Sequence, residues 1–143
     1  MTDAIAVDPP DTTFQALAPV RLLDTRYDVP SGASKLSSSK PVTFQVGGRG
    51  GVPADAIAVS GNLTVTGPPS SGYVTLGPIV GPAPKTSTIN FPKSDTRANG
   101  VIVALDRNGK LEAVYRGGSG TTTHLVFDVT GYFVAGDSGS RYV

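Results

Sequence analysis

Charged and amide side chains interrupt several apolar stretches that otherwise have the alternating pattern of β-strands. In the segment RLLDTR, residues 21–26, charges stand among leucines, and further polar residues occur in SGNLTVT, STINF, RANGV and VFDVTGYF. Charges on an apolar strand are costly to bury unless they pair. We therefore predict that these charges pair inside the folded domain, in a buried structural network that sets strand register more than it adds stability. Its members are Asp24, Arg26, Asn62, Asn90, Asn99 and Asp128.

The same side chains are also the donors and acceptors that sugar hydroxyl groups need, so a glycan site is the functional alternative. Such a site needs an exposed aromatic ring on which a sugar can stack, and the chain has no Trp and five Tyr. The possible glycan contacts are Tyr27, Tyr73 and Tyr132. Exposed tyrosines beside Asp and Asn would favour the glycan site. Buried tyrosines, with Asp24 paired to Arg26, would favour the structural network.

The segment GDSGS, residues 136–140, contains the residue types found around an activated serine nucleophile. Such a serine needs a histidine base within hydrogen-bonding distance and an aspartate that orients the histidine. The chain has one histidine, His124, and it falls in a predicted strand shortly before this segment. We therefore interpret GDSGS as a polar tail and assign no catalytic residues.

Metal and phosphate chemistry is not indicated by the sequence. With no Cys and a single His, the chain lacks the nitrogen and sulfur ligands of a zinc-type site. The carboxylates Asp24, Asp28, Asp106 and Asp128 do not have the close spacing of a calcium loop. The glycine-rich segment GGRGG, residues 47–51, is not followed by a helix pattern that would bind a phosphate. We predict no bound metal and no cofactor.

Short strand patterns separated by turn-forming residues run along the whole chain, which has 18 Gly and 12 Pro. No apolar stripe of helical spacing runs far without a Gly or Pro. Many short strands at close spacing predict an all-β, single-domain β-sandwich with a jelly-roll-like topology. The predicted strands are 14–17, 20–25, 41–46, 56–66, 72–77, 86–91, 99–106, 110–116 and 122–134.

Two segments have the pattern of β-hairpins. In VIVALDRNGKLEAVY, residues 101–115, the pair Asn108-Gly109 is typical of a type I′ turn between two strands. In NLTVTGPPSSGYVTL, residues 62–76, a Pro-Pro turn follows a Thr-rich alternation. We expect the sandwich domain to cover residues 14–143, preceded by a flexible N-terminal arm, residues 1–13, and ending in a flexible tail.

The charge balance argues against nucleic acid and membranes as partners. The net charge is +1, and the 12 Lys and Arg are scattered among 11 Asp and Glu. A protein that neutralises phosphates needs a basic patch, which the sequence lacks. No apolar stretch approaches the ~20 residues that span a bilayer. The first residues, MTDAIAVDPPDTTF, lack the basic and apolar regions of a signal peptide.

Five segments together carry a resemblance to a known family: APVRLLDTR (18–26), GRGGVPADAIAVSGNLTVT (48–66), GYVTLGP (72–78), STINFPKSDTRANGVIVALDRNGKLEAVY (87–115) and HLVFDVTGYF (124–133). They resemble a β-domain that is repeated in large cell-surface proteins of actinobacteria and some other bacteria, and that also occurs in their phages. The resemblance covers nearly all of residues 14–143. The terminal SRYV is similar to the junction that leads into a following copy.

The resemblance implies surface display and a scaffolding or adhesive role, and it implies no enzyme. Because the chain starts with Met and has no signal peptide, we expect a phage virion protein, such as a head decoration or fibre component, ahead of an excised bacterial surface repeat. The expected location is the virion surface or the cell exterior. The expected partners are a capsid or other surface assembly and further copies of the chain, for example in a trimer.

Overall fold

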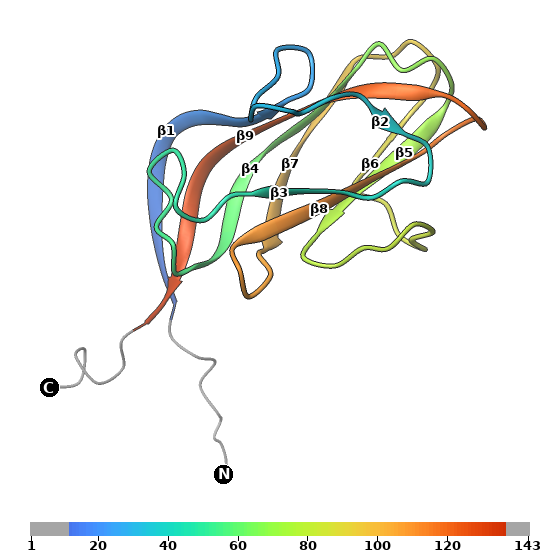
Figure 1. Cartoon of the computed structure of the whole chain (residues 1–143). Coiled ribbons are helices and arrows are strands. Elements are labelled where there is room, and N and C mark those ends of the chain that lie inside the picture. Colours follow the sequence, from blue (N-terminus) through green and yellow to red (C-terminus); the bar gives the residue numbers. More distant parts are fainter. Residues whose placement is uncertain (1–11, 137–143) are drawn as a thin grey trace, which may run out of the picture.

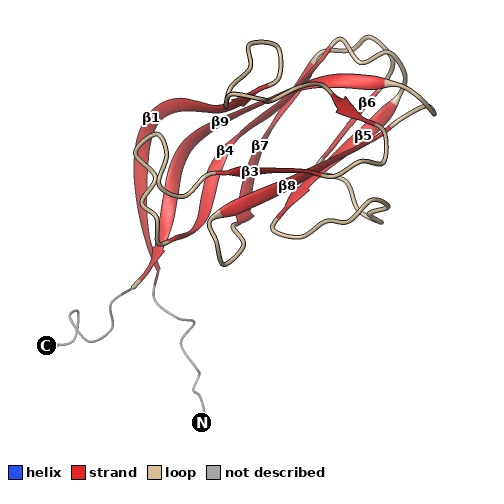
Figure 2. Ribbon diagram, viewed as in Figure 1, coloured by secondary structure: helices blue, strands red, loops and turns tan. Residues whose placement is uncertain are grey.

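The computed structural model describes residues 12–136, which form strands and loops without a helix (Figure 2). No helix in this part of the chain is long and apolar enough to cross a membrane. The strands are β1 (Thr12–Asp24), β2 (Leu36–Ser37), β3 (Val42–Gln45), β4 (Ala56–Thr66), β5 (Gly72–Gly77), β6 (Ile89–Phe91), β7 (Arg97–Ala104), β8 (Lys110–Arg116) and β9 (Thr122–Ala135).

The strands form two antiparallel sheets that pack against each other (Figure 1). The first sheet has the order β1-β9-β4-β7, with β2 paired to β9 off this path, and the second has the order β3-β8-β5-β6. Leaving β2 aside, the first, eighth, third and sixth strands make one sheet, and the second, seventh, fourth and fifth make the other. This is the order of a jelly roll. The predicted all-β jelly-roll-like sandwich is confirmed.

The core lies between the sheets because one face of each strand is apolar. In β4, Val59, Leu63 and Val65 are fully buried, whereas Asn62 is exposed and Thr64 is partly exposed. This period-2 alternation is the pattern from which the strand was predicted. The largest fully buried side chains are Tyr115, Phe127, Leu23, Leu36, Leu63, Ile89, Leu111 and Leu125.

The first strand differs from its prediction, since the two expected strands at 14–17 and 20–25 are one long edge strand. The β1–β9 ladder is irregular between Ala16 and Val20 and again between Arg21 and Leu23. Pro19 lies in the first irregular stretch and has no N–H group to donate, which an edge strand tolerates. The second irregularity lets both Leu22 and Leu23 become buried.

Neither predicted hairpin forms a ladder between its two strands. β7 belongs to the first sheet and β8 to the second, and β4 and β5 are divided in the same way. Of the pair Asn108-Gly109, Gly109 has the positive φ, 77°, whereas a type I′ turn needs two. Instead, Asp106 Oδ1 accepts the backbone N–H groups of Asn108 and Lys110, both at 2.8 Å. These turns carry the chain from one sheet to the other.

The described ends of the chain lie side by side at one end of the sandwich, where Thr12 pairs with Ala135 (Figure 1). β1 therefore begins within the range expected as an arm. Residues 1–11 and 137–143, which hold the rest of the arm and the tail, lie outside the described residues.

The loops after β4, β6 and β8 hydrogen-bond to one another. Gly118 N donates to Ser70 Oγ at 3.0 Å, and Ser94 N donates to Pro68 O at 2.7 Å. Because β4 runs away from the end marked by Thr12 and Ala135, the loop after β4 and the two loops bonded to it lie at the opposite end of the sandwich (Figure 1).

Candidate functional site

The charged residues of RLLDTR form an ion-pair chain with Asp128. Both carboxylate oxygens of Asp24 accept from the Arg26 side chain, at 2.9 Å from Nε and 2.9 Å from Nη2. Arg21 lies between the two aspartates. It donates Nε and Nη2 to Asp128 at 2.8 and 3.1 Å, and Nη1 to Asp24 at 3.3 Å. Two-pronged guanidinium–carboxylate contacts of this kind are among the stronger side-chain hydrogen bonds.

This ion-pair chain lies on the outer face of the first sheet. Phe127 belongs to the core, so its neighbours Val126 and Asp128 point to the opposite side of β9. Asp24 is paired with Val126, and Arg21 with Asp128, and directly opposed residues share a face. The prediction that these charges pair inside the folded domain is therefore corrected: they do pair, but on the outer face of the sheet. The irregularity at Leu22 turns Arg21 to the same face as Asp128.

Asp24 is nevertheless buried, with 1% of its surface exposed, while the two arginines are partly exposed. The bonds from Arg26 lower the pKa of the Asp24 carboxyl, and burial opposes this shift. The backbone N–H of Arg26 also donates to Asp24 Oδ1, at 3.0 Å. Asp24 is thus held ionised and joins the end of β1 to the turn that follows it.

The three predicted asparagines do not bond to the ion-pair chain. All three are exposed. Asn90 Nδ2 donates to Ser87 Oγ at 2.8 Å, which is a contact within its own segment. Asn99 Nδ2 donates to Thr88 O at 3.2 Å and so links β7 in the first sheet to the segment before β6 in the second. Asn62 lies opposite Asp128 in the β4–β9 ladder without a hydrogen bond to it among the described contacts.

The three tyrosines named for the glycan alternative have different environments. Tyr27 is 71% exposed, and the Arg26 guanidinium lies over its ring at 5.1 Å from the ring centre. Tyr73 is half-buried and donates its hydroxyl to Pro84 O at 3.1 Å. Tyr132 is half-buried and packs against the core. Tyr27 is the one of the three that offers an open ring face beside the ion-pair chain.

His124 contacts the same turn from β9. Its Nδ1 lies 2.9 Å from the hydroxyl of Thr25, which is buried and also accepts the N–H of Leu125 at 2.9 Å. Burial lowers the pKa of His124, and the positive charges of Lys35 and Arg26 lower it further. At neutral pH the imidazole is therefore held neutral. This favours a role in fixing the turn. Ser138 of the GDSGS segment, which we interpret as a polar tail, lies outside the described residues.

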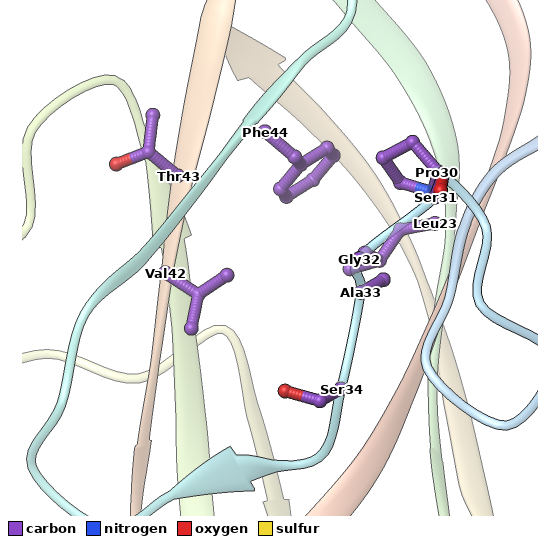
Figure 3. Close-up of a pocket in the computed structure, with 9 residues that line it drawn as sticks. All are labelled: Leu23, Pro30, Ser31, Gly32, Ala33, Ser34, Val42, Thr43 and Phe44. Atoms are coloured by element: carbon purple, nitrogen blue, oxygen red, sulfur yellow. The ribbon is translucent and has the colours of Figure 1, made fainter.

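A pocket of about 230 Å³ lies between the loop of residues 30–34 and β3 (Figure 3). Val42 and Phe44 point from β3 toward the loop, whereas Thr43 points away. Leu23 and Pro30 close the other side. Ligand pockets are typically larger, roughly 300–1,000 Å³, with several convergent polar groups. Within residues 12–136, no group of three or more His, Asp or Glu side chains is placed to hold a metal ion.

Comparisons with known proteins did not assign the chain to a family: no family model matches it, and no curated protein matches it. Sequence reasoning named Asp24, Arg26 and Asp128 but left out Arg21, which joins them. An alternating strand puts Arg21 and Asp24 on opposite faces. Only the irregular register of the β1–β9 ladder brings them together, and no residue type in the sequence indicates this irregularity.

Proposed function

We propose that the protein is a non-catalytic structural and interaction module displayed on the exterior of a larger assembly. The observation that carries this proposal is the pairing of Thr12 with Ala135 at one end of the sandwich, with a loop cluster at the other. A domain joined to its assembly through both terminal segments holds its opposite end outward. Jelly rolls serve this way in viral capsids, although a fold alone does not imply a function.

The state of the charged side chains supports a structural role over a catalytic one. Acid–base catalysis needs a group whose pKa lies near the working pH. The contacts from Arg26 lower the pKa of Asp24, and burial lowers the pKa of His124, so each stays in one protonation state near neutrality. Asp24 and Asp128 also both have their oxygens engaged by arginine side chains.

Between the two exterior locations, we favour the virion surface, as a head decoration or fibre component, over a cell-surface repeat. The test is labelling with an antibody raised against the purified chain. The expected result is that intact virions are labelled without disruption. Labelling of intact cells instead would assign the chain to the cell surface. Labelling only after lysis would overturn exterior display.

Glycan binding is the second candidate, and the open ring of Tyr27 favours it. An exposed aromatic ring backed by a guanidinium can stack on a sugar face while nearby charged groups bond hydroxyls. The test is a glycan array followed by titration of any binding glycan. Tyr27→Ala should then weaken binding about tenfold or more, a loss of roughly 1.4 kcal/mol. The control is Ile79→Ala, which removes a more exposed side chain elsewhere, 86% exposed.

A further inference from the structure

The outer face of the first sheet carries two neighbouring rows of uncharged side chains near the end marked by Thr12 and Ala135. Between the rows, Val59 pairs with Tyr132, and both pack into the core, so the residues on either side face outward. Across the four strands, the first row is Phe14, Phe133, Ala58 and Ala104, and the second is Ala16, Gly131, Ser60 and Ile102.

Large apolar side chains in these rows are exposed. Ile102 is 73% exposed and Phe14 is 47% exposed, and Ile57, at the irregularity beside Ala58, is exposed as well. The Phe14 ring lies 4.9 Å from that of Phe133, and it covers Gly131, where a Cβ would meet it at 2.4 Å. Among residues 12–136, three of the five exposed large apolar side chains thus lie at this end of one sheet. The largest exposed apolar patch of a monomer, typically about 300–600 Å², is often functional.

We propose that this apolar face packs against the same face of a second copy of the chain. The rows contain no charged side chain, so two copies can meet without like-charge repulsion. The hydroxyl groups of Ser60 and Thr130 bond to each other at 3.0 Å, so covering them leaves neither without a partner. A partner recognised by charge would instead need acidic or basic groups in these rows.

The shape of the face also fits its own copy. A shallow depression lies on the β7 side, lined by Ser60, Asn62, Gly100, Ile102 and Thr130 among others, while Phe14 stands on the β1 side. A two-fold axis parallel to the strands sets β1 of each copy opposite β7 of the other. Phe14 of each copy then lies opposite Ala104 of the other, next to Ile102 at the edge of the depression, which is the reciprocal contact of an isologous dimer.

The size of the face sets the strength of the contact. Four strands about 4.8 Å apart and two to three rows make a patch of roughly 300 Å². A stable complex buries about 800 Å² on each partner, so the pairing is weak, with a dissociation constant on the order of 0.1–1 mM. Copies tethered on a shared assembly reach effective concentrations in this range, on the order of millimolar.

This inference goes beyond the proposed function. Self-association is measured on the purified chain and exterior display by antibody labelling, so either proposal can fail without the other. The experiment is sedimentation velocity of the full chain from about 10 µM to about 2 mM, the range that brackets this affinity. The mean mass should rise toward that of a dimer. A constant monomer mass, or a rise past the dimer to a closed trimer, would overturn the two-fold contact.

Matched charge substitutions test whether the apolar face makes the contact between copies. Ile102→Asp should weaken association about tenfold or more, because each copy then buries an unpaired carboxylate. Ile79→Asp, at an exposed site on the loop after β5, should associate as the unchanged chain does. Equal losses in the two variants would mean non-specific contact and would overturn the proposal. Ile102→Ser is the milder variant, in case the aspartate disturbs β7.

The absence of natural cysteine permits a second, independent readout. A single cysteine placed by Ser60→Cys lies near the centre of the rows, close to the expected axis. It should form a disulfide-linked dimer several-fold faster than Ser119→Cys, which is exposed in the loop cluster at the other end. Equal rates would indicate random collision and would contradict face-to-face pairing.

Deleting residues 1–11 should leave the rate of disulfide formation by Ser60→Cys unchanged. A loss of that rate would show that this segment provides the contact.

Discussion

The outer face of the first sheet has two halves, one with charged side chains and one with apolar side chains. Toward the loops, Arg21, Asp24, Arg26 and Asp128 satisfy one another through side-chain hydrogen bonds. Toward the chain ends, Phe14 and Ile102 leave apolar surface in contact with water. The charged half is complete within one chain, whereas the apolar half gains free energy only when another surface covers it. The halves should therefore respond differently to mutation, one in folding and the other in association.

The largest expected effect is on the charged half. Asp24→Asn removes the charge that both arginines contact, and it should lower the free energy of unfolding by about 2 kcal/mol, the size of a hydrogen bond to a charged group. Urea unfolding measures the change. Self-association should be unaffected, and so should any glycan affinity. A variant that unfolds like the unchanged chain but loses glycan binding would show that Asp24 belongs to a ligand site.

The exposed pair Arg97–Asp95, joined at 2.5 Å, is the matched control for this ion-pair chain. Asp95→Asn should change the free energy of unfolding by less than about 0.5 kcal/mol, because solvent-exposed pairs contribute little. Urea unfolding under the same conditions makes the comparison. If this substitution cost as much as Asp24→Asn, burial of Asp24 would not be the reason for its contribution.

Acid should weaken the charged half selectively. The pKa of Asp24 is lowered from 3.8 in the folded chain, mainly by Arg26, so the unfolded chain takes up a proton first. The stabilisation is full above about pH 4–5 and is lost as the pH falls through the folded pKa. Urea midpoints between pH 7 and pH 2 measure this loss. The loss should be smaller in Asp24→Asn, and an equal loss in both chains would assign it to other carboxyl groups.

The apolar half should give smaller changes in folding. Phe14→Ala removes a ring that packs on Phe133 and Gly131 but remains half exposed, so it should cost about 1 kcal/mol. Thermal and urea unfolding of dilute protein, below about 20 µM, keep association out of the measurement. A cost above about 3 kcal/mol would place Phe14 in the core and remove it from the proposed contact surface.

The smallest expected change in folding is that of Ile102→Ser. The side chain is mostly exposed on an edge strand, so the free energy of unfolding should shift by less than about 0.5 kcal/mol. The same variant should nevertheless weaken dimer formation, as measured by sedimentation at high concentration. A large loss of stability with unchanged association would show that Ile102 contributes to folding and not to the contact between copies.

Local pattern was enough to predict most of the strands. The predicted ranges 56–66, 72–77 and 110–116 agree with β4, β5 and β8 at both ends, because alternation and glycine-rich turns mark these strands directly. β2, with two residues, was missed because so short a strand has no period. The candidate site was predicted less fully. Asp24 and Arg26 are close in the sequence and were named together, while Arg21 and the apolar rows depend on pairing between distant strands.

The sequence by itself determined that the chain is all-β and where strands such as β4, β5 and β8 begin and end, because alternation and turn residues act within a few positions. Only the tertiary structure decided to which sheet each strand belongs. A turn such as Asp106–Lys110 reverses the chain equally well inside a hairpin and between two sheets. The choice comes from which distant strands pair and bury their apolar faces together. That same choice placed the charges of RLLDTR outside the sandwich and gathered Phe14 and Ile102 on one face.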